Sequence, residues 1–299
     1  MKNKLYILGN GFDLAHDLPT RFDPNFKDIA QKYEQYNFWD IYQSREGDIW
    51  SDFENLLGYP DFNTLGEIFE GYAPDYLSDR ESDRDGIIYQ VELNGNLRTA
   101  LYEFADEADD SLCNIQVNDL IKQILDSDGY YITFNYTHTL EKVYDIPWNQ
   151  ILHIHGEVGK DNLELGYPKG SFIPEKYSYD ARGKGIGPYI EIEIEDHIKD
   201  IEDYYTRTAY ENLLDKCESF YKESRIDLLE DFLSKNQCII EEIIVYGHSC
   251  AIDFDYFSYL NKRYSNAYWK FYVRGAEQEG NVCWLIEKYS IKNADIVKV

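Results

Sequence analysis

The sequence is poor in positive charge. It has 29 Lys and Arg against 56 Asp and Glu, which gives a formal net charge of -27. Proteins that bind nucleic acids or anionic membranes need clustered Lys and Arg to neutralise phosphate groups. The composition therefore argues against both as partners. It leaves room for a small anionic ligand, because a helix N-terminus can bind a phosphate group within an acidic protein.

The sequence is also poor in cysteine and in long hydrophobic runs. Its five Cys are odd in number and form no CxxC pair, so we expect them to fill the core of a reduced protein. No segment approaches the roughly 18 uninterrupted apolar residues of a transmembrane helix. The apolar run after Lys2 and Lys4 is too short for a signal peptide. These absences predict a cytoplasmic protein with no membrane partner.

The chain has what a large folded domain needs. It has 299 residues, of which 43% are hydrophobic, and 28 Tyr dominate its aromatic residues. Tyr buries a large ring but needs a hydrogen-bond partner for its hydroxyl group, so we expect a core with many polar anchors. One large domain or two small ones would fit this length.

Strand-like and helix-like segments alternate along the chain, which predicts an α/β fold: a Rossmann-like, mostly parallel sheet with helices on both faces. We expect a single domain over residues 1–299, with helical parts at about 26–125 and an acidic helical insertion at about 170–236. Residues 61–85 are expected to form a surface loop. The predicted strands lie at 5–8, 130–134, 151–155, 163–167, 242–246, 269–273 and 296–299, and the predicted helices at 26–36, 50–57, 87–108, 117–125, 206–222 and 226–234.

The opening stretch, Lys4–Thr20, places glycines directly after an apolar run. Gly9 and Gly11 flank Asn10, and Phe12 leads into an expected helix. Such a turn presents backbone N–H groups to a phosphate, and glycines permit the close approach. The dinucleotide fingerprint GxGxxG lacks its third glycine, because the sequence reads GNGFDL. Taken alone, the turn fits a phosphate site and a tight turn without a ligand equally well.

Four apolar strands end in a polar or glycine-containing cluster: GNGFD, FNYT, HIHG and YGHS in chain order. Ligands of open α/β sheets bind outside the carboxyl ends of the strands, so parallel, adjacent strands would bring the four clusters to one crevice. Their side chains supply hydrogen-bond donors, carboxylates and imidazoles but few positive charges, which favours a neutral or nucleotide-like ligand. The polar candidates are Asn10, Asp13, Asn135, Thr137, His138, His153, His155, His248, Ser249 and Asp253.

Other interpretations of these residues stay open. His153 and His155 lie two apart on a predicted strand and face the same way, so they could form a metal site with Asp13 or His248. A hydrogen-bonded structural role is nevertheless the more common fate of a semi-buried His. Asp13 could instead cap the helix that it precedes.

Four residues are not expected to act as catalytic groups. The GHSC cluster lacks the GxSxG pattern of a nucleophile elbow, so we do not expect Cys250 or its neighbouring serine to be a nucleophile. His16 and His197 have no supporting neighbours in the sequence. We therefore predict that both lie on the surface.

Taken together, the motifs resemble the bacteriophage abortive infection AbiH family. They are GNGFDLAHDLPT, WSDFE at Trp50–Glu54, TFNYTHTLE at Thr133–Glu141, HIHG at His153–Gly156, and YGHS with Asp253. That family in turn is similar to the sirtuin-like NAD-binding fold. There, a glycine-rich turn, an Asn loop, a His-Gly pair and a Gly-x-Ser follow one another in the same order.

The resemblance implies roles in NAD cleavage. His155 would be the general base, and Asn135 would orient the ribose or the attacking water. Gly9, Asn10 and Gly11 would receive the diphosphate. No zinc-binding cysteine quartet is present, so NAD itself, not an acylated protein, is the expected substrate, and no metal is expected. The other implied cofactor-binding residues are Phe12, Asp13, Thr137, His153, Gly156, Gly247, His248, Ser249 and Asp253.

The sequence thus leads to three hypotheses. The first is an anti-phage effector that binds and hydrolyses NAD at the nicotinamide–ribose bond. The second is a nucleotide-binding sensor or regulator without turnover, and the third is a metal-dependent hydrolase or nuclease. Fold resemblance does not decide among them. We expect a small-molecule nucleotide as ligand, and the insertion at 170–236 is where we would look for a regulatory protein or a second copy of the chain.

Overall fold

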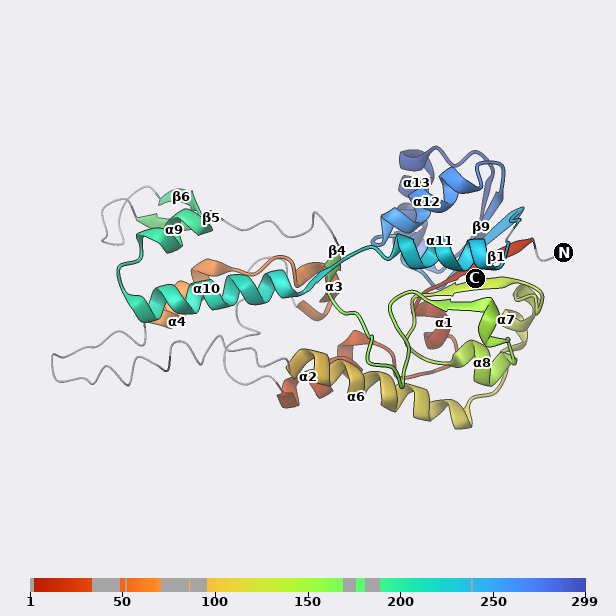
Figure 1. Cartoon of the computed structure of the whole chain (residues 1–299), viewed down its shortest axis with the longest axis horizontal. Helices are drawn as coiled ribbons and strands as arrows, with labels where there is room; N and C mark the ends of the chain where they lie inside the picture. The colour runs from red at the N-terminus through yellow and green to blue at the C-terminus, as the bar shows by residue number, and fades with distance from the viewer. Residues whose placement is uncertain are drawn as a thin grey trace. The chain divides into compact units, whose positions relative to one another are not determined.

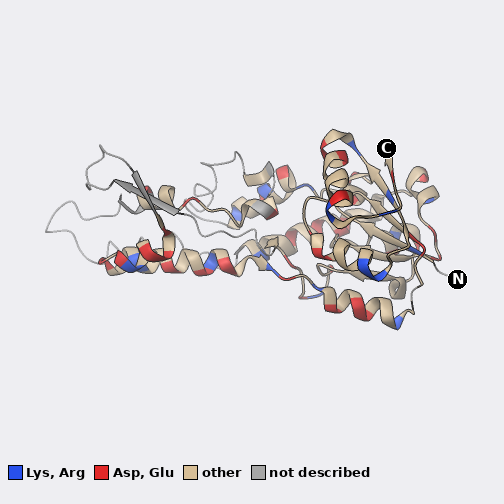
Figure 2. Ribbon diagram, turned by 90° about the horizontal axis from the view of Figure 1, so that it is seen from above, with Lys and Arg blue, Asp and Glu red and all other residues tan. Residues whose placement is uncertain are grey.

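The chain forms two compact units (Figure 1). The computed structural model describes residues 3–33, 49–51, 53–70, 86, 96–168, 176–180, 189–237 and 239–299. The first unit comprises residues 1–26, 101–164 and 223–299, and the second comprises residues 27–100 and 165–222. The region expected to be an insertion therefore lies largely in the second unit, together with residues 27–100. In each unit, acidic positions are spread over the helices, with Lys and Arg scattered among them (Figure 2).

The first unit is built on a parallel β-sheet. Among the described residues this sheet has six strands in the order β10-β9-β8-β1-β2-β3, and every neighbouring pair is parallel. The predicted α/β fold is thus confirmed. The strands are β1 (Lys4–Leu8), β2 (Tyr130–Thr133), β3 (Ile151–His153), β8 (Glu242–Tyr246), β9 (Tyr268–Val273) and β10 (Ala294–Lys298).

The strand order reverses between β1 and β8. When the six strands are numbered by their order in the chain, their order across the sheet, read from β3 to β10, is 3-2-1-4-5-6. Doubly wound dinucleotide-binding folds have this order. Leu5 of β1 pairs with Tyr130 of β2 on one side and with Ile243 of β8 on the other. Ligands of such sheets bind outside the carboxyl ends of the strands at this reversal. The segments that follow β1, β2, β3 and β8 are therefore the place to look for a site.

Strand β1 is buried on both faces, which explains its continuous apolar run. Leu5 and Ile7 belong to one hydrophobic core, to which three helices contribute: α11 (Ile226–Lys235), α12 (Phe254–Arg263) and α13 (Gly275–Tyr289). Tyr6 and Leu8 belong to a second core, to which two helices contribute: α7 (Asp119–Ile124) and α8 (Thr139–Tyr144). Figure 1 shows these two groups of helices on opposite sides of the sheet.

Tyrosines anchor the second core through their hydroxyl groups. The rings of Tyr6 and Tyr131 stack with their centroids 4.7 Å apart. The Tyr6 hydroxyl donates to the carbonyl of Ile124 (3.0 Å), and the Tyr131 hydroxyl donates to the carbonyl of Asp126 (2.6 Å). Burial raises the pKa of both phenols, so both stay neutral and remain donors. These are the polar anchors that the high tyrosine content predicts.

The helices of the first unit connect its strands. The side chain of Asn118 caps α7 by accepting hydrogen bonds from the N–H groups of Leu120 and Ile121. No helix in the described part of the chain is long and apolar enough to cross a membrane. The helical segments are α1 (Gly11–Leu14), η1 (Phe22–Phe26), α6 (Asn96–Asp110) from Leu101 onward, η4 (Ser111–Asn114), α7 (Asp119–Ile124), α8 (Thr139–Tyr144), η5 (Trp148–Gln150), α11 (Ile226–Lys235), α12 (Phe254–Arg263) and α13 (Gly275–Tyr289).

The second unit combines helices with two small strand pairs. β4 and β7 pair in parallel, and β5 and β6 form an antiparallel pair. Lys222 and Glu54 form a largely buried ion pair at 3.1 Å. Its elements are α2 (Lys27–Tyr33), η3 (Ile49–Ser51), α3 (Phe53–Leu56), α4 (Phe62–Glu70), β4 (Tyr167–Pro168), β5 (Lys176–Asp180), β6 (Tyr189–Glu193), α9 (Ile194–Asp200), α10 (Tyr204–Ser219) and β7 (Tyr221–Lys222).

Several predicted elements differ from the structure. The loop expected at 61–85 is wrong in part, because α4 covers Phe62–Glu70. The strand expected at 163–167 is reduced to Tyr167–Pro168, and the antiparallel pair β5–β6 was not predicted. Short apolar runs between charged residues do not by themselves separate strand, helix and loop, which explains these differences. The predicted helices at 26–36 and 87–108 lie partly outside the described residues.

Glycines hold the turn after β1 against the turn after β8. The N–H of Gly9 donates to the carbonyl of Tyr246 (3.1 Å), and the N–H of Gly11 donates to the carbonyl of Gly247 (2.8 Å). A Cβ on Gly11 would lie 2.7 Å from the Cα of Gly247. Gly247 itself has φ +69°, and a Cβ there would clash with the amide nitrogen of Phe12. The two turns can pack this closely only because neither carries a side chain at the contact.

This packing predicts opposite effects for two Gly→Ala substitutions. Gly247→Ala should lower the free energy of unfolding by about 3 kcal/mol or more, because it adds both a clash and an unfavourable φ. Gly280→Ala is the matched control, since Gly280 lies in α13 and a Cβ added there would meet no atom within 4 Å. It should raise the free energy of unfolding by about 0.5–1 kcal/mol. Urea denaturation measures both, and a tolerated Gly247→Ala would contradict the packing described.

Candidate functional site

The four polar clusters predicted from the sequence meet at one edge of the sheet. Thr137, which follows β2, donates a hydrogen bond of 2.6 Å to Asp13, which follows β1. His155, which follows β3, has its Nε2 3.5 Å from Oδ1 of Asp253, which follows β8. The convergence inferred from the sequence is therefore present. We call the segments 9–13, 134–139, 153–157 and 247–253 the carboxyl edge.

Asp13 is fully buried and held by two hydroxyl groups. Thr137 donates to its Oδ2 (2.6 Å), and Thr139 donates to its Oδ1 (2.8 Å). The two hydroxyl oxygens are themselves 3.0 Å apart. Asp13 lies inside α1 and does not cap it; the N-cap residue is Asn10. The helix-cap interpretation of Asp13 is therefore wrong.

This triangle can form with Asp13 in either protonation state. A proton on Asp13 can be donated to Thr137, whose proton then goes to Thr139, whose proton returns to the other carboxyl oxygen, so that all three contacts are hydrogen bonds. When Asp13 is ionised, both hydroxyl groups donate their protons to it. No proton then lies between the two hydroxyl oxygens, so their contact is not a hydrogen bond. Burial raises the pKa of Asp13 to about 6, although its hydrogen bonds and the nearby His153 oppose the shift.

Two imidazoles pack against the ring of Phe134, and one carboxylate contacts both imidazoles. The centroid of the Phe134 ring lies 4.9 Å from that of His155 and 4.6 Å from that of His248. Asp253 lies between the imidazoles, with Nε2 of His248 3.7 Å from its Oδ2. The N–H of Cys250 donates to Nδ1 of His248 (3.0 Å), so the neutral His248 carries its proton on Nε2, facing Asp253.

Two buried side chains of the carboxyl edge lack hydrogen-bond partners. Both amide atoms of Asn135 and the Nε2 of His155 make no hydrogen bond. The Asn135 amide lies close enough to favour the ionised form of Asp13, yet its geometry does not complete a hydrogen bond. Buried polar groups are nearly always paired, and each one left unpaired costs about 1–3 kcal/mol. Asn135 and His155 are therefore the residues that a ligand would satisfy.

Asn135 and His155 occupy corresponding positions at the ends of two neighbouring strands. Thr133 of β2 pairs with His153 of β3, so Asn135 and His155 each lie two residues beyond a paired position on neighbouring parallel strands. The ladder continues past the pair, because the N–H of Ile154 donates to the carbonyl of Thr133 (3.0 Å). The two predicted catalytic residues thus occupy equivalent places on adjacent strand ends.

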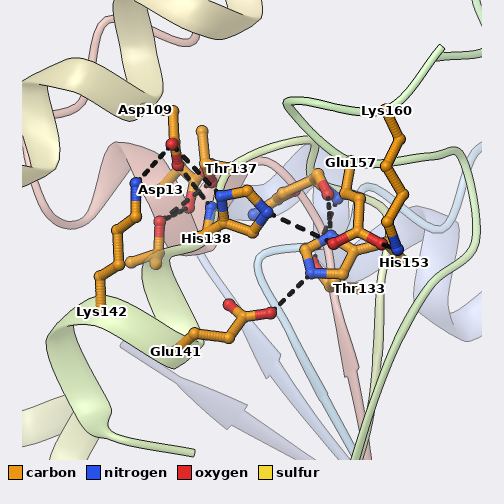
Figure 3. Close-up of polar contacts among 12 residues, drawn as sticks. Asp13, Asp109, Thr133, Thr137, His138, Glu141, Lys142, His153, Glu157 and Lys160 are labelled. Carbon is orange, nitrogen blue, oxygen red and sulfur yellow. Dashed lines mark hydrogen bonds and ion pairs between the residues drawn. The ribbon is translucent and has the colours of Figure 1, made fainter. Parts of the chain in front are cut away.

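Another histidine of the carboxyl edge, His138, forms a network with charged residues (Figure 3). Its Nδ1 lies 3.2 Å from Asp109 of α6, and its Nε2 lies 3.3 Å from Glu157. Burial alone would lower the pKa of His138, but its contacts with the two carboxylates outweigh burial and raise it. Burial alone would raise the pKa of Asp109, but hydrogen bonds from His138 and Lys142 hold it well below its usual range. The two carboxylates on either side of His138 therefore favour its imidazolium form.

His153 is enclosed by protein groups, contrary to its predicted role in cofactor binding. Its Nδ1 lies 3.0 Å from the carbonyl oxygen of Asn135, and its Nε2 lies 2.8 Å from Oε1 of Glu141 on α8 (Figure 3). Neither ring nitrogen is left for a ligand. Glu141 and Thr139 lie in the TFNYTHTLE motif but are not among the predicted site residues. Asp109 is not among them either, because the sequence around it contains no motif that indicates a site.

The glycine turn does not offer the expected diphosphate site. The N–H groups of Gly9 and Gly11 are engaged by the carbonyls of Tyr246 and Gly247. The Asn10 side chain donates to the carbonyl of Thr20 (2.6 Å). The prediction that these amides receive a diphosphate is therefore wrong for Gly9 and Gly11.

Other predicted residues serve the fold. The Phe12 ring is buried in the second core, 6.3 Å from the ring of Tyr246. Gly156 has φ +90°, and a Cβ there would clash with Asn162, so it shapes its turn. Ser249 is exposed and accepts a hydrogen bond from the N–H of Ala251 (3.3 Å).

His16 and Cys250, which are not expected to act as catalytic groups, both have structural roles. His16 is buried, not exposed as predicted, and its ring nitrogens contact the carbonyl of Phe12 (2.7 Å) and the hydroxyl of Tyr144 (2.6 Å). Burial raises the pKa of Cys250 to about 12, which suits a core thiol and not a nucleophile. In the parts of the chain that the structure describes, no group of three or more His, Cys, Asp or Glu is placed to hold a metal ion.

The buried carboxyl group predicts a pH-dependent effect of Asp13→Asn. Folded Asp13 keeps its proton up to about pH 6, whereas the unfolded chain loses it near pH 3.8. The folded state thus binds more protons in this window, and its stability falls as pH rises through the window. Asn cannot titrate and can complete the same ring of hydrogen bonds. Between about pH 5 and pH 7.5, the stability of Asp13→Asn relative to the native sequence should therefore rise by about 1 kcal/mol.

Urea denaturation at the two pH values measures this difference. Asp128→Asn is the control, because Asp128 is exposed, and its relative stability should change little with pH. A relative stability of Asp13→Asn that is constant, or that falls as pH rises, would contradict the protonated triangle.

Comparison with known proteins adds the family. The family model described as bacteriophage abortive infection AbiH matches residues 5–273, which include the whole carboxyl edge. No curated protein matches the chain, and no solved structure matches it. The chain belongs to the AbiH family of bacteriophage abortive infection proteins.

Proposed function

We propose that this abortive infection protein binds NAD at the carboxyl edge and hydrolyses its nicotinamide–ribose bond. The observation that carries the proposal is a pair of buried groups without a hydrogen bond at neighbouring strand ends: the Asn135 amide, and Nε2 of His155, which lies 3.5 Å from Oδ1 of Asp253. The strand order supports it, because dinucleotide-binding folds use this edge of the same sheet arrangement. The motif resemblance to sirtuin-like folds supplies NAD as the dinucleotide.

The proposed hydrolysis does not require the protein to form a covalent bond with the substrate. The bond from ribose C1′ to the nicotinamide nitrogen breaks, and its electron pair stays with nicotinamide. The oxygen of a water molecule bonds to C1′, and the water proton passes to a base. Since C1′ develops oxocarbenium character in such reactions, a strong nucleophile is not required. The products are nicotinamide, ADP-ribose and one proton.

The unpartnered groups fit these steps. The imidazole of His155 can accept the proton of the water or of a ribose hydroxyl at neutral pH. The Asn135 amide has a donor and an acceptor with which to orient the ribose or the water. Because Gly9 and Gly11 are engaged by the turn after β8, the ribose, and not the diphosphate, is the part of NAD assigned to this edge.

Nicotinamide release from NAD tests the proposal. Purified protein, with and without extract from phage-infected cells, should release nicotinamide. His155→Ala and Asn135→Ala should each lower the rate by about 100-fold or more, because acid–base catalysis and orientation both act in the transition state. Asn114→Ala, which changes an exposed Asn outside the carboxyl edge, is the control and should leave the rate unchanged.

Two outcomes would contradict NAD hydrolysis. One is no release under either condition; the other is release that both variants leave intact. A thermal shift with NAD or ADP-ribose but without release would favour the nucleotide-binding regulator, because a ligand that binds only the folded state stabilises it. Loss of activity on removal of a metal would favour the metal-dependent hydrolase.

A further inference from the structure

The contacts of His153 fix the protonation of one of its nitrogens. Nδ1 lies 3.0 Å from the backbone carbonyl oxygen of Asn135, which has no hydrogen to donate, so Nδ1 must carry a proton. Nε2 lies 2.8 Å from Oε1 of Glu141, and one proton lies between them. Either an imidazolium faces a carboxylate, or a neutral imidazole faces a carboxylic acid. In both forms Nδ1–H points at Asn135.

Glu141 holds the imidazole ring of His153 from its opposite side. The carbonyl of Asn135 keeps the proton on Nδ1, and the carboxyl group of Glu141 fixes the ring through Nε2. Without Glu141 the ring could turn, so the contact that ties the turn carrying Asn135 to β3 would weaken. The side chains of His153 and Glu141 are only 5% and 3% exposed, so water cannot readily replace the lost partner.

The contact reaches the segment that bears the unpartnered amide. Asn135 is also held through its own N–H, which donates to Oγ1 of Thr133 (3.1 Å). His153 thus joins three elements: its own strand β3, the turn after β2, and α8, which carries Glu141. The backbone of Asn135 is held at both its N–H and its carbonyl, which fixes the origin of its side chain.

We propose that Glu141 and His153 are positioning residues that aim the Asn135 amide at the ribose or the attacking water, an inference that rests on the proposed NAD hydrolysis. Both nitrogens of His153 are used within the protein, so His153 acts on the substrate only through Asn135. Glu141 fixes the imidazole ring of His153 through Nε2, and His153 fixes the place of Asn135 through Nδ1. When a positioning residue is removed, the group that it orients is displaced slightly, and the rate of catalysis falls for that reason.

A double-mutant cycle tests the proposal with NAD as substrate. Glu141→Ala should lower kcat by about tenfold or more with KM within about threefold of the native value. In an Asn135→Ala background, the same substitution should cause no further loss, because the group that it positions is gone. Asp109→Ala is the matched control: it removes a buried carboxylate that lies outside the carboxyl edge and contacts another buried histidine, His138. It should lower stability while leaving kcat within about threefold. Equal losses from Glu141→Ala in both backgrounds would overturn the proposal.

Nitrogen-15 NMR separates this inference from the proposed activity. In the native protein, Nδ1 of His153 should be protonated whether or not NAD is cleaved. The side-chain amide signals of Asn135 should shift in Glu141→Ala and stay in place in Asp109→Ala. If the native protein does not cleave NAD, the proposed function fails and the amide shift alone decides the positioning role. An unprotonated Nδ1, or Asn135 signals that Glu141→Ala leaves unmoved, would overturn it.

Discussion

The contact between the turns after β1 and β8 is the constraint on which the candidate site depends. The hydrogen bond of 2.8 Å from Gly11 to Gly247 fixes two strand ends at the point where the strand order reverses. Side chains at these glycines would push the turns apart. Their close approach brings Asp13, on one turn, and His248, on the other, to the same edge of the sheet. The glycines therefore act here through packing between backbones and not through contact with a phosphate.

Most polar groups at this edge satisfy one another, which makes the exceptions informative. Asp13 is enclosed by two threonine hydroxyls, His138 by two carboxylates, and His153 by a carboxylate and a carbonyl. A network this well paired is rigid, because each rearrangement would leave a buried group without a partner. Against it, the unpartnered Asn135 amide and Nε2 of His155 mark where a substrate can add hydrogen bonds.

The sequence predicted the convergence but not the partners within it. Apolar runs that end in polar clusters were sufficient to place GNGFD, FNYT, HIHG and YGHS at one edge, because parallel strands share their carboxyl ends. The direction of each side chain was not predictable in this way. Phe12 is buried in the core, and His16 is buried against Tyr144. Asp109 of α6 contacts His138, from which it is distant in the sequence. Local periodicity assigns a residue to an element, whereas its partners depend on how distant elements pack.

The central claim is that Asn135 and His155 bind the ribose of NAD. The most direct measurement is a crystal structure of the His155→Ala variant and of the native protein, each soaked with ADP-ribose. The account predicts ribose oxygens within hydrogen-bonding distance of the Asn135 amide in both, and of His155 Nε2 in the native protein. ADP-ribose bound elsewhere, with both groups still unpartnered, would contradict it.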